Sequence, residues 1–280
     1  YIPATNYAVK RMNDLPLCTR LLKEVHAVLL AESRGSEKNP GEIRTTQNWI
    51  GPTGCLLSQA SYVTPNVDAM QDALGDLEKF INEATRDDID PIVKAALVHY
   101  QFETIHPFAD GNGRLGRLLI TLSLMNDDVL GEAVFYPSYQ LKLRRHEYYE
   151  SLMAVRERGQ YAQWVRFFCS CMLSSAEDAV GSLEKLVNLR NLNVTLISDN
   201  LGRSAANGLR LLEMLEGNPI VDVSFVAEKL AVSRTTASNL VSDFAKLGIL
   251  VQREEDRQRY RTFLYEDYLT IRRQGSEPLK

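Results

Sequence analysis

The sequence predicts a mainly α-helical protein of two domains, and three features of the 280-residue chain lead to this prediction. Apolar residues recur at spacings of three and four along most of the chain, which is the period of amphipathic helices. Strand-like character in the first half is confined to residues 42–66. From Ser204 onward, short helical patterns are followed by two extended runs, which is typical of a separate small domain. A chain of this length is long enough for two domains with their own cores.

Composition excludes several classes of protein. The formal net charge of −4 gives no general attraction to nucleic acid or to an anionic membrane. The four cysteines are scattered, and Cys169-x-Cys171 lacks a second Cys/His pair at zinc spacing, which favours buried thiols over a metal site. No apolar run approaches the length of a membrane span, and the N-terminus lacks the regions of a signal peptide. We therefore expect a cytoplasmic protein without a membrane partner.

The first half of the chain is predicted to be helical around one hairpin. Residues 7–31 form one or two helices, and a run of breakers at 33–41 predicts a loop. Two short extended runs around a Gly/Pro turn predict a β-hairpin at 42–66. An amphipathic helix covers residues 68–84, and a mostly apolar helix over 91–102 begins with proline in its first turn.

The middle of the chain is also helical by pattern. Residues 141–158, 160–173 and 177–201 each carry apolar residues at helical spacing. His26 and His99 lie on predicted helices of the first half, and we interpret both as hydrogen-bonded structural residues rather than ligands.

One segment combines a histidine, a carboxylate, a Gly-Asn-Gly turn and two arginines: His106-Pro107-Phe108-Ala109-Asp110-Gly111-Asn112-Gly113-Arg114-Leu115-Gly116-Arg117. The turn leaves backbone N–H groups free, and the leucines after it place the turn at a helix N-terminus, where the dipole favours phosphate. Arg114 and Arg117 share a helix face and are suited to phosphate oxygens. Asp110 suits Mg²⁺ held together with phosphates and water. His106 is suited to take a proton from an attacking hydroxyl, because imidazole ordinarily titrates near neutral pH. The alternative is a capped helix with a surface histidine and solvated arginines.

This segment resembles the signature of the Fic family, His-x-Phe-x-Asp/Glu-Gly-Asn-Gly-Arg-x-x-Arg, at every specified position. The resemblance implies a Fic-fold helical bundle over residues 1–175 and transfer of AMP from ATP to a Ser, Thr or Tyr hydroxyl of a target protein or of the chain itself. It also implies the role of each residue: a general base at His106, a Mg²⁺ ligand at Asp110, a phosphate nest at Gly111, Asn112 and Gly113, and phosphate-holding side chains at Arg114 and Arg117. Transfer of another phosphate-containing group, or nucleotide sensing by a DNA-binding regulator, stays an alternative.

Two further parts of the site follow from the same resemblance. The hairpin at 42–66 is similar to the Fic flap, which pairs with an extended segment of the target. Leu143, Tyr148 and Tyr149 lie where the family places residues beside the adenine, and ordinary packing of the two tyrosines is the alternative. Many members carry an asparagine near this tyrosine pair, where this chain has Arg144 and Arg156. The base of the preferred nucleotide is therefore left open.

Fic proteins are commonly silenced by a helix bearing Ser/Thr-x-x-x-Glu-Gly/Asn, whose glutamate pairs with the second signature arginine. The nearest match in this chain, Glu216-Gly217, has Leu212 where Ser or Thr is needed. We therefore expect such a helix to lie upstream of Tyr1, to have been lost or to be provided by another chain, and we expect residues 1–280 to be de-repressed.

The C-terminal part is predicted to be a helical connector at 176–203 and a winged-helix-like domain at 204–280. The leucines of the connector indicate a seam within the chain or between two copies of a homodimer. Three helices and two extended runs follow, and Arg234 begins the predicted recognition helix. Between Ser204 and Thr262 eight bases balance eight acids, whereas a DNA reader usually shows a basic stripe. DNA binding therefore competes with target docking and dimerisation.

Overall fold

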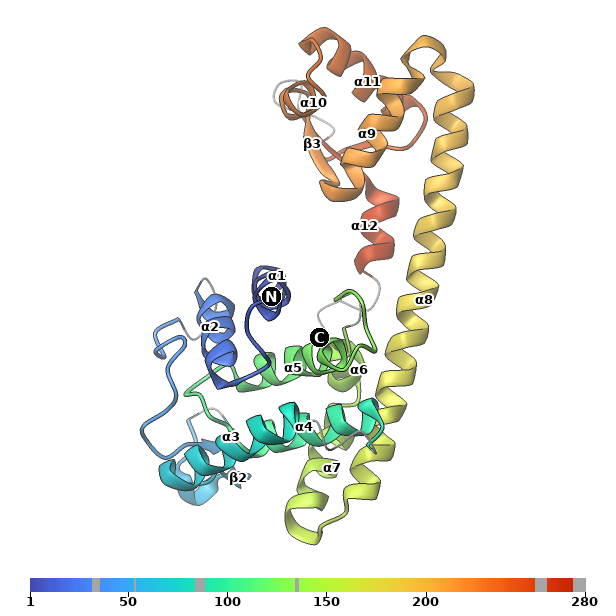
Figure 1. The fold of residues 1–280 in the computed structure, drawn as a ribbon. Coiled ribbons are helices and arrows are strands. Elements are labelled where there is room, and N and C mark those ends of the chain that lie inside the picture. Colours follow the sequence, from blue (N-terminus) through green and yellow to red (C-terminus); the bar gives the residue numbers. More distant parts are fainter. Residues whose placement is uncertain (32–35, 53, 84–88, 134–135, 255–260, 274–280) are drawn as a thin grey trace. The chain divides into compact units, whose positions relative to one another are not determined.

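The computed structural model describes residues 1–31, 36–52, 54–83, 89–133, 136–254 and 261–273, and it is mainly helical with small sheets, as predicted (Figure 1). The chain divides into two compact units, Tyr1–Ala176 and Glu177–Lys280. None of the helices in these ranges is apolar over a stretch long enough to span a bilayer. The helices are α1 (Ile2–Met12), α2 (Thr19–Leu30), α3 (Val67–Asn82), α4 (Pro91–Ile105), α5 (Asn112–Asn126), α6 (Ser138–Leu143), α7 (Arg145–Arg158), α8 (Tyr161–Asn200), α9 (Ala205–Gly217), α10 (Val223–Leu230), α11 (Arg234–Lys246) and α12 (Glu266–Arg273).

The first unit is built around the helix pair α4 and α5, which lie side by side (Figure 1). One face of the pair packs against α1, α2 and α3 in a core that includes Phe102, Leu118 and Leu122. The other face packs against α6, α7 and the first turns of α8, where Trp164 and Phe168 are completely buried. Helix α4 is therefore apolar on nearly all sides, which explains why its sequence shows little amphipathic contrast.

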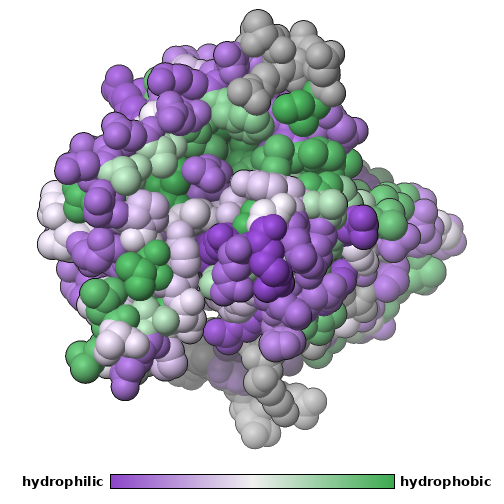
Figure 2. Space-filling view, turned by 90° about the horizontal axis from the view of Figure 1, so that it is seen from below, coloured by the Kyte–Doolittle hydropathy of each residue, from purple (hydrophilic) through white to green (hydrophobic). Residues whose placement is uncertain are grey.

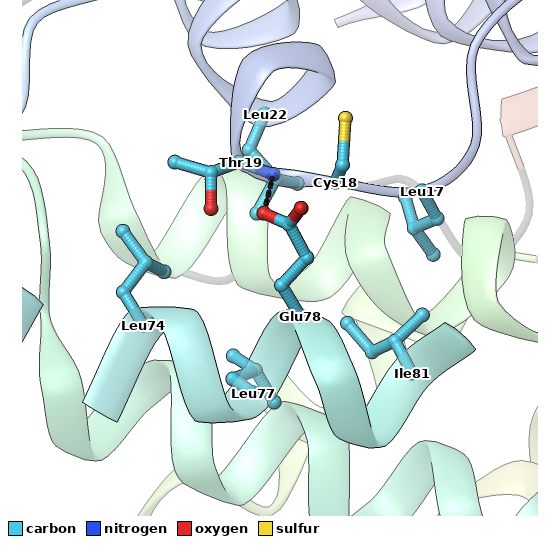
Figure 3. A pocket seen from close by; sticks show the side chains of 8 residues that line it. All are labelled: Leu17, Cys18, Thr19, Leu22, Leu74, Leu77, Glu78 and Ile81. Carbon is cyan, nitrogen blue, oxygen red and sulfur yellow. Dashed lines mark hydrogen bonds between the residues drawn. The ribbon is translucent and has the colours of Figure 1, made fainter. Parts of the chain in front are cut away.

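Side-chain caps fix where these helices begin. Asp90 accepts hydrogen bonds from the N–H groups of Ile92 and Val93 at 2.9 and 3.3 Å, and Pro91 occupies the first helical position, as the sequence predicts. Helix α2 is capped from outside: Glu78 of α3 accepts the N–H of Thr19 at 2.8 Å, beside the leucines that join the two helices (Figure 3). A carboxylate at a helix N-terminus also interacts favourably with the helix dipole.

The predicted hairpin is confirmed. Strands β1 (Trp49–Ile50) and β2 (Tyr62–Val63) pair antiparallel, with Trp49 opposite Val63 and Ile50 opposite Tyr62. A 3₁₀ turn at Leu57–Gln59 lies between them. The hairpin precedes α3, whose N-terminus is capped by Asn66 through the N–H of Ala69.

The second unit contains the later part of α8, the helices α9 to α12 and a three-stranded antiparallel sheet. The strands are β3 (Ile220–Asp222), β4 (Val251–Gln252) and β5 (Thr262–Leu264), in the order β3-β5-β4. Val221 lies opposite Phe263, and Gln252 pairs with Phe263 from the other side. The helices and the sheet enclose one core that includes Leu211, Phe244 and Phe263.

Several predicted boundaries are wrong. The two helices expected at 160–173 and 177–201 are one continuous helix, because Ser174, Ser175 and Ala176 between them contain no helix breaker; the hydroxyl of Ser175 bonds the carbonyl of Cys171 at 2.8 Å within the helix. The helix expected at 141–158 is interrupted at Arg144, between α6 and α7. Strand β3 and helix α12 are not anticipated, and residues 259–260 of the last predicted strand lie outside the described residues.

Candidate active site

His106 stands at the C-terminal end of α4 in a left-handed backbone conformation, with φ 50° and ψ 60°. Its N–H still donates to the carbonyl of Phe102 at 2.9 Å, so the residue ends the helix and turns the chain away from it. A residue with a Cβ atom adopts this conformation at an energetic cost, and it persists only where the surroundings hold it.

Arg44 holds this turn from the neighbouring segment. Its side chain is buried, and its guanidinium donates to four carbonyl oxygens: Nε to His106 at 3.0 Å, Nη1 to Thr46 at 2.8 Å, and Nη2 to Pro65 at 2.6 Å and Ile105 at 3.5 Å. Burial lowers the pKa of Arg44 from its ordinary value. One guanidinium thus ties the base of the hairpin to the end of α4, which couples the hairpin to the position of His106.

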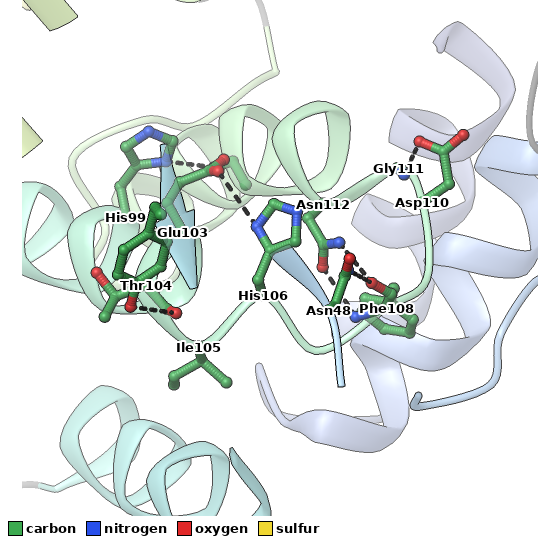
Figure 4. A network of polar contacts seen from close by, with 12 residues as sticks. Asn48, His99, Glu103, Thr104, Ile105, His106, Phe108, Asp110, Gly111 and Asn112 are labelled. Carbon is green, nitrogen blue, oxygen red and sulfur yellow. Dashed lines mark hydrogen bonds and ion pairs between the residues drawn. The ribbon is translucent and has the colours of Figure 1, made fainter. Parts of the chain in front are cut away.

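The loop after His106 is closed by Asn112, the first residue of α5. The side-chain oxygen of Asn112 accepts the N–H of Phe108 at 2.9 Å, and its amide nitrogen donates to the carbonyl of Phe108 at 2.7 Å (Figure 4). Asn48 also donates to the Phe108 carbonyl, at 3.3 Å. The Asn112 side chain therefore shapes the loop, and only its backbone N–H is left for a bound anion.

His26 supports the same loop from α2, as expected of a structural histidine. Its Nδ1 accepts the N–H of Gly41 at 2.8 Å, so its Nε2 carries the hydrogen and donates to the carbonyl of Asp110 at 2.9 Å. Its ring stacks on Phe108 at 3.9 Å between centroids. Burial lowers the pKa of His26, which agrees with a neutral ring.

The N-terminus of α5 is open. Gly111 precedes it with φ 80°, and no side chain caps its first turn in the part of the chain that the structure describes. A Cβ atom at Gly111 would lie 3.0 Å from Nε2 of His26, so both the conformation and the space require glycine. The first N–H groups of the helix belong to Asn112 and Gly113. Unpaired N–H groups at a positive dipole end form a binding site for an anion such as phosphate.

The two arginines and the carboxylate of the signature surround this helix end. Nη1 of Arg117 lies 3.2 Å from the Cβ position of Gly113, so the guanidinium of Arg117 folds back over the first turn. Arg114 approaches Asp110 at 3.8 Å, and their side chains are 28% and 40% exposed. A partly exposed carboxylate beside an anion site fits a Mg²⁺ ion that takes its other ligands from phosphate and water. No cluster of three or more His, Cys, Asp or Glu with metal-binding geometry occurs among the described residues.

The pKa of the His106 imidazole differs from the near-neutral value that the sequence analysis assumes. Burial lowers this pKa to about 4, although the backbone of Glu103 opposes this effect, and Arg156 and Arg44 act in the same direction as burial. The ring is therefore neutral at neutral pH and has a lone pair with which to accept a proton. An anion bound at the nearby helix end would raise this pKa, because a negative charge favours the imidazolium.

Of the three residues predicted to lie beside the adenine, the structure buries Tyr148 and exposes the other two. Tyr148 is 5% exposed, and its ring packs beside Trp164 and Phe167. Its hydroxyl bonds Nε2 of His99 at 3.0 Å, and Nδ1 of His99 bonds the carbonyl of Gly116 at 2.9 Å. Because a carbonyl only accepts, Nδ1 of His99 carries the hydrogen, and Tyr148 donates to Nε2. Tyr148 thus supports α5 from behind.

The other two residues predicted for the adenine side are exposed. Leu143 is 53% exposed at the end of α6, and Tyr149 is 45% exposed on α7. Arg144, between them, pairs with Glu147 at 2.6 Å. An exposed ring and an exposed leucine keep apolar area that is available to a base.

The sequence gives no role to one charged group at the site, Glu103, and anticipates another, Arg156, only as an arginine near the tyrosine pair. Glu103 is buried in the last turn of α4, and its Oε2 lies 4.0 Å from Nδ1 of His106. Arg156 of α7 donates to the carbonyl of Glu103 at 3.2 Å, and its guanidinium stacks over the ring of Tyr62, 3.6 Å from the centroid. The signal for Glu103 is present in the sequence, because it is the sole carboxylate between Pro91 and Ile105 and precedes His106 by one helical turn.

Comparison with known proteins agrees with this geometry. The model of the Fic/DOC family matches residues 16–124. The protein adenylyltransferase fic-1 of Caenorhabditis elegans is 32% identical over 162 residues, which cover 58% of this chain and 28% of the relative. The protein adenylyltransferase Fic of Culex quinquefasciatus is 32% identical over 171 residues, covering 61% of this chain and 30% of the relative. The chain thus spans less than a third of the length of these curated relatives.

A solved structure extends the likeness in fold to nearly the whole chain. The crystal structure of a Fic family protein from Desulfovibrio desulfuricans G20 superposes with a TM-score of 0.54 and 20% identity, covering 94% of this chain and 73% of the other. At this identity the likeness concerns the fold alone. Taken with the family match and the arrangement of His106, Gly111 and Arg117, these findings show that the chain contains a Fic/DOC domain.

Proposed function

We propose that this chain is a protein adenylyltransferase, which transfers AMP from ATP to a Ser, Thr or Tyr hydroxyl of a target protein or of itself. The observation that carries the proposal is the position of a neutral histidine, His106, just before an uncapped helix N-terminus flanked by Arg114 and Arg117. The names of the curated relatives, which match up to 61% of this chain, support the same activity.

In the proposed reaction, the triphosphate of ATP binds at the N-terminus of α5. The N–H groups of Asn112 and Gly113 and the guanidinium groups of Arg114 and Arg117 stabilise the phosphates. His106 takes the proton of the target hydroxyl, whose oxygen forms a bond to the α-phosphorus. The bond from that phosphorus to the leaving diphosphate breaks, and the positive helix end stabilises the charge that develops there. The fixed helices α4 and α5 supply the orientation.

Asp110 is the residue that we propose for Mg²⁺. Its carboxylate faces Arg114 and accepts the N–H of Gly111, which fixes it beside the phosphate site. When bound, Mg²⁺ neutralises part of the phosphate charge.

We propose that the target docks on the hairpin. The two strands form a two-stranded sheet within the described residues, so each has an outer edge to which an extended peptide can add. Figure 2 shows one face of the molecule, on which hydrophobic side chains reach the surface in patches among hydrophilic ones. Exposed apolar residues of the hairpin region are Trp49, Leu56, Leu57 and Val63.

The remaining proposals concern the contact with adenine, the domain boundaries, the cellular location and the role of the last domain. We propose Tyr149 and Leu143 for contact with the adenine, with Tyr148 behind them. The domain boundaries proposed are 1–175 for the catalytic domain, 176–203 for the connector and 204–280 for a winged helix, which the order α9, α10, α11 and the sheet β3-β5-β4 supports. We place the protein in the cytoplasm. Balanced charge in the last domain favours target docking or homodimer formation over DNA binding.

The test is to incubate the protein and a cell lysate with ATP labelled at the α-phosphate or, in a parallel reaction, at the γ-phosphate. Adenylyl transfer puts label on protein from α-labelled ATP alone, whereas a kinase gives the opposite result. His106→Ala is expected to abolish the α-label while ATP binding persists. His146→Ala, which removes an exposed histidine of α7, is the matched control and keeps the label. Label that survives in His106→Ala would refute the assignment of the base.

A further inference from the structure

Glu103 is a buried carboxylate that the proposed reaction does not yet use. It lies in the last turn of α4, is 6% exposed, and points toward the ring of His106 (Figure 4). Its Oε1 is buried without a hydrogen-bond partner among the described residues, and Nδ1 of His106 is in the same state. Its other oxygen, Oε2, is 4.0 Å from that Nδ1. Two buried polar groups therefore face each other just beyond hydrogen-bond distance.

Such a carboxylate is costly, since burial disfavours its charge and an unsatisfied acceptor loses its water. Burial raises the pKa of Glu103 to about 7, although Arg117 of α5 and Arg156 of α7 partly offset this effect. The neighbouring helix makes room for the group: a Cβ atom at Gly116 would lie 2.5 Å from Oε1 of Glu103. Arg156 fixes the backbone of Glu103 through its carbonyl. The Glu103 carboxylate is thus held in a defined position, although its burial is energetically unfavourable. Packing alone does not explain why a carboxylate stands here.

We propose that Glu103 is a positioning residue for His106, accepting a hydrogen bond from Nδ1–H so that the unprotonated Nε2 faces the hydroxyl of the target. This inference rests on the proposed function. An N–H···O⁻ bond needs about 2.8 Å between the heavy atoms, so a side-chain movement of about 1 Å closes the pair. When Nε2 takes the proton of the hydroxyl, Nδ1 keeps its own proton, and the carboxylate stabilises the imidazolium until that proton is released.

The surroundings offer one competing role. Arg117 also interacts with Glu103, and in the competing role the carboxylate serves only to balance the arginine that we place on the phosphates. In that case its removal would weaken ATP binding and leave the imidazole unchanged. Removal of the carboxylate therefore changes the His106 imidazole if Glu103 positions it, and changes ATP binding if Glu103 only balances Arg117.

The test uses the full chain and the variant Glu103→Gln, which keeps the size of the side chain and removes its charge. The first measurement is the ¹⁵N NMR spectrum of the His106 imidazole, assigned by comparison with His106→Ala. We expect the parent to show Nδ1 protonated and Nε2 unprotonated, and Glu103→Gln to shift the population toward the other tautomer. Identical His106 signals in parent and variant would overturn the inference, whether or not the protein transfers AMP.

The second measurement is the transfer of label from α-labelled ATP. We expect Glu103→Gln to lower kcat at least about tenfold, as part of the 10²–10⁴-fold that a general base contributes, with KM for ATP unchanged within about twofold. An unchanged kcat, or a raised KM for ATP, would contradict positioning. Absence of label with the parent protein would instead count against the proposed function.

Discussion

Gly116→Ala is the substitution that tests the packing behind the site most sharply. Gly116 is buried in α5, and an added Cβ would lie 2.5 Å from Oε1 of Glu103 and 3.1 Å from Cδ1 of Phe102, which is completely buried. Atoms do not approach to 2.5 Å without displacement, so the carboxylate of Glu103 must move. Phe102 is also close to the added methyl group, so the substitution strains the packing of both side chains.

The expected magnitude is the sum of two opposing effects. Alanine is favoured over glycine in a helix by about 1 kcal/mol. Overpacking of a filled interior costs about 1–3 kcal/mol. Gly75→Ala in α3 is the matched control, because nothing lies within 4 Å of its Cβ position and Gly75 is exposed. We therefore expect Gly75→Ala to stabilise the protein and Gly116→Ala to be less stable than that control by about 1–3 kcal/mol.

Urea denaturation followed by tryptophan fluorescence measures this difference. Both tryptophans, Trp49 and Trp164, lie in the first unit, so the signal reports on the unit that carries the site. Gly116→Ala should also slow AMP transfer, because it displaces the carboxylate beside His106. An increase in the free energy of unfolding in Gly116→Ala as large as that in Gly75→Ala would refute this expectation.

Three further predictions use the same denaturation assay. Arg44→Met leaves four carbonyls at buried or half-buried positions without this donor and should cost about 3 kcal/mol, with Arg44→Lys intermediate; an unchanged midpoint would contradict this. Asp90→Ala removes the cap of α4 and should cost about 1 kcal/mol, most of which Asp90→Asn should retain. The pKa of His99 falls from 6.5 to about 4 on burial, so the folded state binds fewer protons between these values and stability decreases as the pH falls from 6.5 to 4. This decrease amounts to about 3 kcal/mol. His99→Gln should remove this contribution and leave that of His106, whose pKa burial lowers into the same range, and His146→Ala should remove neither.

The candidate site residues whose positions the sequence predicts best are those that lie in one contiguous segment. His106, Asp110, Gly111 and Arg117 lie within twelve residues, and a glycine turn that opens a helix brings them together by local geometry alone. The start of α4 is equally local, because the cap and the proline are adjacent. Such features require no knowledge of distant parts of the chain.

The parts that escape prediction depend on contacts between distant segments. Arg44 lies 62 positions before His106 and bonds backbone carbonyls, which every sequence has, so no pattern marks it. The tyrosine pair shows a different limit: neighbours on a helix point in directions about 100° apart, so one ring is buried and the other exposed. Only the packing of Trp164 and Phe167 decides that Tyr148 is the buried one.

A crystal structure with an ATP analogue that is not cleaved between its α- and β-phosphates tests the central claim most directly. We predict phosphate oxygens on the N–H groups of Asn112 and Gly113, Arg117 on the outer phosphates, and the imidazole of His106 facing the side of the α-phosphorus from which a hydroxyl enters. Phosphates bound away from this helix end, or a His106 ring that stays covered by Glu103 and its neighbours, would contradict this prediction.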